Sequence, residues 1–318
     1  MRTRAAPQRP PPYSDAVDIS VPGDAVLIGD GGLATELEAR GHDLADPLWS
    51  ARLLLDAPEA IIAVHRAFFD AGAMIATTAS YQASFQGFAA RGVDRAGTVR
   101  LLRRSVELAR TAAGGVHGRW VAASIGPYGA ALADGSEYRG RYGRSVAQLE
   151  NWHRPRIEVL AEAGADILAL ETIPDIDEAE ALVNLVHGLG VPAWLSYTIE
   201  GSRTRAGQLL DEAFAVAAGS AQILAVGVNC CSPDDVLPAI GPAVDTGKPV
   251  VVYPNSGQRW SRRRRTWLGP SRFSAHTAEQ WVAAGARIVG GCCRVRPADI
   301  AELAALLRRG AQPRAVGR

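Results

Sequence analysis

Three of the four cysteines in this 318-residue chain lie where a thiolate-bound metal would need them. Cys230 ends the motif Gly227–Cys230, and the adjacent Cys292 and Cys293 end the motif Gly290–Cys293. Both motifs follow short apolar runs of β type, and Gly290-Gly291 allows the sharp turn that adjacent ligands need. Three sulfur ligands leave one tetrahedral position of Zn²⁺ open, which is typical of a reactive site. The alternative is that these cysteines are small buried hydrophobic residues.

The composition narrows the class of protein. The net charge is +1, so no overall field attracts nucleic acid or an anionic membrane. Arg262–Arg265 could suggest a nucleic-acid patch, but in a charge-balanced chain we interpret it as a solvated loop. We find no secretion signal, and no apolar run approaches the roughly 18 residues that span a bilayer. We therefore expect a cytoplasmic protein with reduced cysteines and no nucleic-acid or membrane partner.

The elements that must position these cysteines alternate along the chain. The runs that we predict as strands are Val26–Gly29, Ala73–Thr77, Trp120–Ser124, Ile167–Leu170, Ala193–Tyr197, Ile223–Val228, Pro249–Tyr253 and Arg287–Val289. The segments predicted as helices include Val99–Ala113, Asp177–Leu189, Asp211–Ala218 and Pro297–Arg308. Eight βα repeats predict a single (β/α)8 TIM barrel over residues 23–312, with a doubly wound open sheet as the alternative. Residues 1–22 are predicted to be a disordered Pro- and Arg-rich extension, and residues 313–318 a flexible tail.

Polar and glycine-rich motifs follow most of the predicted strands, at the end where barrel enzymes place their active sites. They are Asp30–Gly32, Thr77–Thr78, Gly126–Tyr128, Glu171–Thr172, Asn229–Cys230, Pro254–Gly257 and Gly291–Cys293. The stretch Gly29–Gly32 follows a strand and opens a helix, as a phosphate loop does. It lacks the G-x-G-x-x-G spacing and contains an acidic residue, so we exclude a dinucleotide site.

In this order, the motifs resemble those of the zinc-dependent homocysteine S-methyltransferases, whose fold is a (β/α)8 barrel. The matching segments are Asp30–Thr35, Leu44–Ser50, Thr77–Ala83, Ser124–Gly129, Glu171–Asp175, Gly227–Cys230 and Gly290–Cys293. The segments Leu44–Ser50, Ala133–Tyr138 and Val252–Gly257 are similar to the single-domain type that uses S-methylmethionine. Thr172 stands where betaine-dependent relatives carry a tyrosine, and 318 residues cannot hold the folate and cobalamin domains of methionine synthases.

The resemblance implies a metal-activated nucleophile. Cys230, Cys292 and Cys293 would hold Zn²⁺, which binds the homocysteine thiol and deprotonates it. The resulting thiolate would attack the methyl group of a sulfonium donor and give methionine. Trp49 and Tyr81 match motifs that line the donor pocket in relatives, and aromatic faces hold a sulfonium by cation–π contact. Packing at the barrel mouth is the simpler role for both aromatic residues.

The same resemblance suggests how homocysteine is held. Asp30 and Glu171 are predicted to bind its amino group, although acids near helix starts also act as caps. Gly31 and Thr77 are predicted to donate to its carboxylate, and Asn229 completes the predicted substrate-binding set. Cys231, which follows a predicted ligand, is interpreted as a packing residue.

Several alternatives stay open at the level of sequence. The acceptor could be another small thiol or a selenol such as selenocysteine, and the donor S-adenosylmethionine. A different class is a thiol redox or sensor protein that uses Cys292 and Cys293, although no C-x-x-C motif is present. A structural zinc site needs a fourth protein ligand, and no histidine adjoins the cysteine motifs. The sequence does not indicate an oligomeric state.

Overall fold

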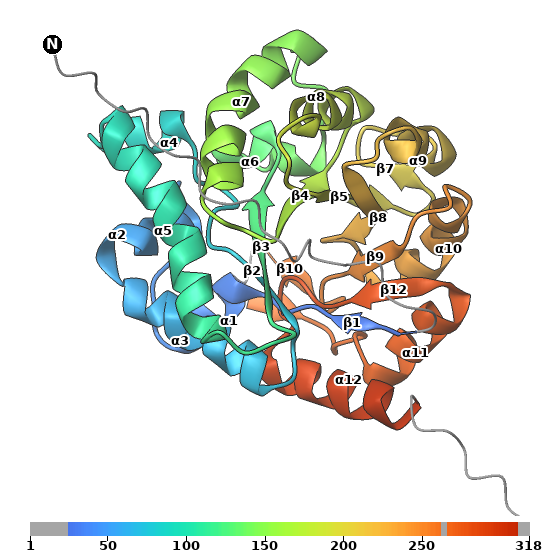
Figure 1. The fold of residues 1–318 in the computed structure, drawn as a ribbon. Coiled ribbons are helices and arrows are strands. Elements are labelled where there is room, and N and C mark those ends of the chain that lie inside the picture. The colour runs from blue at the N-terminus through green and yellow to red at the C-terminus, as the bar shows by residue number, and fades with distance from the viewer. Residues whose placement is uncertain (1–24, 262–265, 311–318) are drawn as a thin grey trace, which may run out of the picture.

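Eight parallel strands form the centre of the molecule, in a computed structural model that describes residues 25–261 and 266–310 (Figure 1). They are β1 (Leu27–Ile28), β2 (Ile75–Thr77), β3 (Trp120–Ile125), β4 (Ile167–Ile173), β5 (Ala193–Tyr197), β8 (Ile223–Asn229), β9 (Val250–Tyr253) and β12 (Ala286–Val289). All eight predicted strands are therefore confirmed. The predictions for residues 1–22, for residues 313–318 and for Arg262–Arg265 lie outside the described residues.

The strand order shows that the sheet closes on itself. The hydrogen-bonded order is β1-β12-β9-β8-β5-β4-β3-β2, and every neighbouring pair is parallel. A further parallel bridge joins Gly29, just after β1, to Ile75 in β2. The two ends of the order thus meet, as they do in a (β/α)8 barrel and not in an open doubly wound sheet.

Helices surround the strands on all sides of the barrel (Figure 1). The longer ones are α3 (Pro58–Asp70), α5 (Arg95–Ala113), α7 (Val146–Glu162), α8 (Ile176–Val186), α9 (Leu210–Ala218), α10 (Pro233–Val244), α11 (Ala275–Ala284) and α12 (Pro297–Gly310). The shorter ones are α1 (Leu33–Ala39), α2 (Leu53–Asp56), α4 (Phe85–Ala89), α6 (Tyr128–Leu132) and the 3₁₀ turns η1 (Trp49–Arg52) and η2 (Ser136–Tyr138). Among the described residues, no helix is long and apolar enough to cross a membrane.

The predicted helices differ from the structure at several boundaries; α9 begins one residue earlier than predicted, and α12 ends at Gly310 and not at Arg308. Helix α5 begins at Arg95 and not at Val99, because the side chain of Asp94 accepts a hydrogen bond from Gly97 N (2.6 Å) and caps the earlier turn. Helix α8 spans Ile176–Val186 and not Asp177–Leu189. The predicted start of α12 at Pro297 is confirmed.

Two short hairpins follow strands β5 and β9. Strand β6 (Ile199–Glu200) pairs with β7 (Arg203–Thr204) in an antiparallel manner, and β10 (Arg259–Ser261) pairs likewise with β11 (Thr266–Leu268). The connection after β9, predicted as a loop, therefore contains strand pairing.

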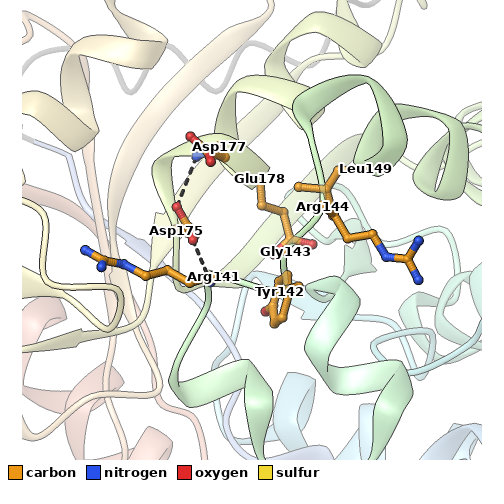
Figure 2. A pocket seen from close by; sticks show the side chains of 8 residues that line it. All are labelled: Arg141, Tyr142, Gly143, Arg144, Leu149, Asp175, Asp177 and Glu178. Atoms are coloured by element: carbon orange, nitrogen blue, oxygen red, sulfur yellow. Dashed lines mark hydrogen bonds between the residues drawn. The ribbon is translucent and has the colours of Figure 1, made fainter.

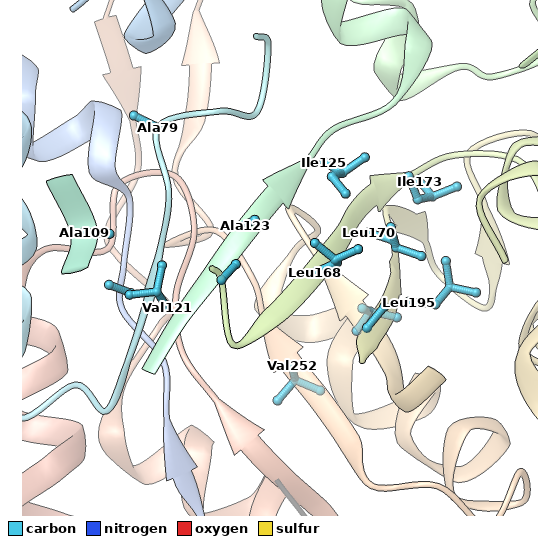
Figure 3. Close-up of a cluster of buried hydrophobic side chains, with 14 of the residues drawn as sticks. Ala79, Ala109, Val121, Ala123, Ile125, Leu168, Leu170, Ile173, Leu195 and Val252 are labelled. Atoms are coloured by element: carbon cyan, nitrogen blue, oxygen red, sulfur yellow. The ribbon is translucent and has the colours of Figure 1, made fainter. Parts of the chain in front are cut away.

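Alternation along each strand divides the core into an inner and an outer layer. The inner layer takes a residue from each of the eight strands: Leu27, Ile75, Ala122, Ile167, Ala169, Trp194, Ala225, Val251, Tyr253 and Ile288. The neighbouring residues point outward and pack under the helices; Val121, Ala123 and Ile125 of β3 and Leu168 and Leu170 of β4 belong to this outer cluster (Figure 3). The same alternation directs Ser124 and Glu171 inward, at the ends of β3 and β4.

Gly227 in β8 lies where β8 and β9 approach each other closely. It pairs with Val251 of β9, and a Cβ atom at Gly227 would overlap the Val251 carbonyl group. The obstacle is main chain, which cannot move away as the end of a side chain can. A side chain at this position must therefore displace β8 from β9.

We predict that Gly227→Ala destabilises the protein by about 1–3 kcal/mol, the usual range for overpacking. The matched control is Gly219→Ala, since Gly219 has a φ of −84° and a methyl group added there would meet no other atom within 4 Å. The control should change stability by less than about 0.5 kcal/mol. Thermal and urea unfolding of both variants measure the difference, and equal stabilities would contradict the close approach.

Candidate active site

A cavity of about 600 Å³ opens at the carboxyl ends of the strands. Its wall takes residues from the ends of β1, β2, β3, β4, β8, β9 and β12, and from the loops that contain η1 and η2. This is the end of the barrel that the sequence predicted for the site. The volume is in the range of cavities that bind small molecules.

The three predicted metal ligands converge on this cavity. Cys230 directly follows β8, whereas Cys292 and Cys293 follow β12. Their three Sγ atoms all lie within 4.8 Å of one another. They are the only group of three or more histidine, cysteine or acidic ligands with this spacing among the described residues. The donor set suits a metal that prefers thiolates.

Main-chain contacts fix the two cysteine loops. Cys230 N donates to the Tyr253 carbonyl (3.3 Å), and Cys292 N donates to the Pro254 carbonyl (2.8 Å). On the other side, Gly291 N donates to the Asp30 carbonyl (2.9 Å). The cysteine loop after β12 is thereby held between the ends of β9 and β1.

The structure pairs Cys230 and Cys292 as a disulfide, with their Cα atoms 5.7 Å apart. Cys293 is free and half-buried; the redox alternative named Cys292 and Cys293, with or without Cys230, and the pair in the structure joins Cys292 to Cys230. Cys231 is buried in the outer hydrophobic cluster, in agreement with its interpretation as a packing residue. A metal at this site requires the reduced form of the cysteine pair.

Glu171 projects into the cavity from near the carboxyl end of β4. It lies within β4, is only 7% exposed, and accepts a hydrogen bond on Oε1 from the Ser124 hydroxyl group. Burial raises the pKa of Glu171 to about 7, and hydrogen bonds from Ser124 and Tyr253 oppose the rise. The capping alternative is wrong for this residue, because the N-cap of α8 is Asp175.

Asp30 lies beside Glu171 at the end of β1. Thr77 N donates to Oδ2 of Asp30 (2.7 Å), and the Thr77 hydroxyl group donates to Oδ1 (3.0 Å). Burial, together with the negative charge of Glu171, raises the pKa of Asp30 to about 8 despite these hydrogen bonds. Capping is excluded here too, because Gly32 is the N-cap of α1.

Two predicted substrate contacts are placed differently by the structure. Thr77 lines the cavity, but both of its donors bind Asp30, so it holds that carboxylate in place. Asn229 is fully buried: its Oδ1 accepts from Thr172 N (2.7 Å) and the Ser196 hydroxyl (2.8 Å), and its Nδ2 donates to Thr172 Oγ1 (2.8 Å). Asn229 therefore supports the residue after Glu171. Gly31 lines the cavity as expected.

The predicted aromatic pair also lines the cavity. The rings of Trp49 and Tyr81 meet edge to face, with centroids 6.2 Å apart and an interplanar angle of 70°. Burial raises the pKa of Tyr81 well above its ordinary value, with smaller contributions from Tyr138 and Glu137. The hydroxyl group is therefore neutral, and the two rings form an uncharged face of the cavity.

The backbone is unusual at several of these positions. Six non-glycine residues among those described have a left-handed φ, and four of them line the cavity: Trp49, Ala133, Thr172 and Cys230. Such conformations are costly and cluster at functional sites, where surrounding contacts hold them. For Thr172 these contacts come from Asn229.

Sequence reasoning assigned no role to several residues that line the cavity. Ser124 contacts Glu171, and the Tyr253 hydroxyl group accepts a hydrogen bond from Trp194 Nε1 (2.9 Å). Glu137 and Tyr138, in η2, also line the cavity. Ser124 and Tyr253 each end a predicted strand. A polar residue at a strand end was therefore the sequence feature that could have identified them as cavity residues.

A second, smaller cavity of about 260 Å³ lies between the loop after β3 and α8 (Figure 2). Asp175 accepts hydrogen bonds there from Arg141 N (2.7 Å) and Asp177 N (3.2 Å). Glu178 accepts from Tyr128 N (2.5 Å) and contacts His153 Nε2 (2.8 Å). Asp175 attaches the loop to the start of α8, and Glu178 attaches α8 to α6 and α7, so we interpret this region as structural.

Comparison with known proteins agrees with this geometry. The model of the homocysteine S-methyltransferase family matches residues 27–307. This chain belongs to that family. A homocysteine S-methyltransferase of Escherichia coli is 47% identical over 296 residues, which cover 88% of this chain and 94% of the relative. A selenocysteine Se-methyltransferase of Brassica oleracea var. italica is 42% identical over 297 residues, covering 85% of this chain and 86% of the relative.

Solved structures show the same fold. The metallated form of the homocysteine methyltransferase MmuM from Escherichia coli has a TM-score of 0.79 and 46% identity, and the match covers 88% of this chain and 96% of that one. An oxidized form of MmuM matches with the same TM-score and identity, over 90% of this chain and 97% of that one. These comparisons confirm the family and the barrel fold that the sequence predicted for this chain.

Proposed function

We propose that this protein is a zinc-dependent homocysteine S-methyltransferase that uses a sulfonium donor, with S-methylmethionine preferred, and produces methionine. One observation carries the proposal: three cysteine sulfurs within 4.8 Å of one another share a cavity with two buried carboxylates and an aromatic pair. The cysteines suit a metal that activates a thiol, the carboxylates suit an amino group, and the aromatic rings suit a cationic donor.

The donor set fits Zn²⁺. Zinc–sulfur bonds of about 2.3 Å in a tetrahedron place thiolates about 3.8 Å apart. The spacing of Cys230, Cys292 and Cys293, within 4.8 Å, accommodates this geometry once the cysteine pair is reduced. When bound, Zn²⁺ supplies a Lewis acid that lowers the pKa of the homocysteine thiol. The metallated form of MmuM, at 46% identity, supports a metal in this family.

Glu171 and Asp30 are proposed to bind the ammonium group of homocysteine. Both are at least 93% buried. Thr77 holds Asp30 at the end of β1, and Ser124 holds Glu171 near the end of β4. Their raised pKa values indicate that the protein itself supplies too little positive charge to stabilise the two ionised carboxylates. An ammonium group supplies the missing positive charge and favours the ionised carboxylates.

The face formed by Trp49 and Tyr81 is proposed to hold the donor. Attack by the acceptor sulfur forms a sulfur–carbon bond as the donor's methyl–sulfonium bond breaks, and the bonding pair leaves with the donor sulfur. The donor therefore loses its positive charge in the transition state. A carboxylate at the sulfonium would stabilise the ground state more, whereas aromatic faces attract the cation weakly and oppose the reaction less.

A selenol is the second candidate acceptor. The selenocysteine Se-methyltransferase of Brassica oleracea var. italica is 42% identical to this chain, and a selenol can make the same contacts as a thiol. Both acceptors require reduced cysteines in the protein. We therefore propose that the enzyme acts in the cytoplasm, where thiols are kept reduced.

We predict that Cys292→Ser loses most of its zinc while it keeps the fold, because the barrel core does not depend on the metal. Cys231→Ala is the matched control, since this cysteine is packed in the core and should leave zinc bound. Metal analysis and circular dichroism under reducing conditions test both variants. Full zinc occupancy in Cys292→Ser would contradict the assignment of the ligands.

We predict two opposite effects for Glu171→Gln. The KM for homocysteine should rise roughly ten- to a hundred-fold, as expected for loss of a charge-assisted hydrogen bond of about 1.5–3 kcal/mol. Stability of the substrate-free enzyme should rise relative to wild type as the pH increases from 5 to 8. Because burial raises the folded-state pKa to about 7, the protonated group favours folding below its ordinary pKa of 4.5, and this contribution is lost as the pH rises through 7.

The control for Glu171→Gln is Glu158→Gln, an exposed position on α7 that should show neither effect. Kinetics and thermal unfolding at pH 5 and 8, on the same preparations, measure both quantities. A variant with wild-type KM would exclude Glu171 from the homocysteine site.

We predict that S-methylmethionine supports methionine formation from homocysteine at least about ten times faster than betaine or methyl-folate. The physical reason is that a sulfonium is already activated, and the wall offers it an aromatic face at Trp49 and Tyr81. S-Adenosylmethionine serves as a second sulfonium in the same assay. Activity with only betaine or methyl-folate would overturn the choice of donor and leave the zinc site unaffected.

A further inference from the structure

The segment that contains η2 forms a wall of the active-site cavity that the proposed mechanism leaves unused. Ala133, Gly135, Glu137 and Tyr138 all line the cavity on this side. They belong to the connection between β3 and α7, and no chemical role was predicted for them. Of these four residues, only Glu137 is ionised in the ordinary pH range.

This wall is firmly attached to the barrel. Asp175, at the start of α8, accepts a hydrogen bond from Arg141 N (2.7 Å), which Figure 2 shows from the side of the smaller cavity. Gly140 N donates to the Ser136 carbonyl (3.1 Å), and Ser136 N donates to Oδ1 of Asp134 (2.9 Å). At Gly129 a Cβ atom would lie 2.5 Å from Glu137 N, so the segment packs directly on α6. Glu137 therefore occupies a defined position.

One oxygen of the Glu137 carboxylate has no partner. Its Oε2 atom is buried and has no hydrogen-bond partner within the described ranges 25–261 and 266–310. Arg139, the adjacent cation, lies 3.7 Å from a carboxylate oxygen of Asp134. Burial raises the pKa of Glu137, and the charge of Asp134 adds to the rise, whereas a hydrogen bond to the backbone of Glu137 and the charge of Arg139 oppose it. A buried carboxylate oxygen without a partner is costly, and a cationic group from a ligand would relieve that cost.

Glu137 lies on a different part of the cavity wall from the other two acids. It belongs to η2, in the connection between β3 and α7, whereas Asp30 follows β1 and Glu171 lies near the end of β4. The cavity thus has two separate acidic positions, one at the strand ends, which form the barrel floor, and one on the η2 wall.

The reaction brings together two amino acids, and each has an α-ammonium group. The floor carboxylates are proposed to serve the acceptor, which leaves the carboxylate on the wall for the donor. The donor's ammonium group keeps its charge throughout methyl transfer, whereas its sulfonium group loses it. A carboxylate at the ammonium group therefore binds the ground state and the transition state equally and does not oppose the reaction.

We infer that Glu137 determines donor specificity by binding the α-ammonium group of a sulfonium amino acid. The inference rests on the proposed function and deepens it. It implies that the enzyme distinguishes S-methylmethionine from sulfonium compounds that lack an amino group, and does so on the η2 wall.

The test compares two donors in wild type and Glu137→Gln. The first is S-methylmethionine, and the second is its des-amino analogue, which keeps the dimethylsulfonium and carboxylate groups. With S-methylmethionine the KM should rise roughly ten- to a hundred-fold in the variant. With the analogue, kcat/KM should be the same in variant and wild type, and the KM for homocysteine should change by less than about two-fold.

Asp134→Asn is the matched control. It removes one negative charge from the same segment, but Asp134 is exposed and does not line the cavity. The asparagine oxygen can still accept the hydrogen bond from Ser136 N. This variant should keep the KM for S-methylmethionine within about two-fold of wild type, and thermal unfolding confirms that both variants fold.

Three outcomes in an active enzyme overturn the inference. They are an unchanged KM for S-methylmethionine in Glu137→Gln, an equal loss with both donors, and a rise confined to the KM for homocysteine. The second would show that the carboxylate acts on the sulfonium or on the shape of the wall. A wild-type enzyme that forms no methionine from either donor overturns the proposed function itself, so the two failures are distinguishable.

Discussion

The site depends on the end of β9, which lies between β8 and β12 and binds both cysteine loops. The carbonyl groups of Tyr253 and Pro254 accept hydrogen bonds from Cys230 N and Cys292 N, which come from opposite sides of the strand. Main-chain contacts thus bring together two cysteines that lie 62 residues apart in sequence, and the structure also joins their sulfur atoms as a disulfide. Because the main-chain contacts do not involve the sulfur atoms, they hold both loops in the reduced form as well, and little ordering remains for ligand binding.

The strand ends that form the floor of the cavity also carry two carboxylates, and the protein alone does not stabilise their charge. Thr77 and Ser124 supply hydrogen bonds to Asp30 and Glu171, yet burial still raises the pKa values to about 8 and about 7. Asp30 and Glu171 therefore reduce the stability of the folded protein at neutral pH when no substrate is bound. The barrel tolerates the cost because its outer hydrophobic layer, between strands and helices, lies away from the cavity.

The sequence was informative about the floor because strand ends in a closed parallel barrel meet at one face. Eight apolar runs predicted the strands, and the motifs after them predicted which residues reach the cavity. It was less informative about hydrogen bonding between neighbouring strand ends. Asn229 and Thr77 have the right residue types for binding a substrate, but their polar atoms are occupied by Thr172, Ser196 and Asp30. These contacts depend on how the strand ends are placed around the barrel, as for Asn229 of β8, which reaches Thr172 of β4 across β5, and no single sequence motif encodes that placement.

The η2 wall was harder to predict for another reason. Glu137 lies in a connection without periodic hydrophobic residues, so neither alternation nor helical spacing indicates which way its side chain points. Its position follows from contacts between this connection and other elements, chiefly Asp175 with Arg141 and Gly129 of α6 with the backbone of Glu137. Contacts of this kind become visible only in three dimensions.

We propose that the strand ends of the floor bind the methyl acceptor and that the turns of the wall bind the methyl donor. The acceptor must be held at a fixed distance from the sulfur cluster, and strand ends joined by main-chain hydrogen bonds provide a rigid frame for that purpose. The proposed donor contacts come instead from Tyr81 in the loop after β2, from Trp49 in η1 and from Glu137 in η2; η1 lies between α1 and α2, and η2 between α6 and α7. Loops accept substitutions more readily than barrel strands do. A change of donor can therefore arise in the turns, while the barrel keeps the acceptor and the cysteines in register.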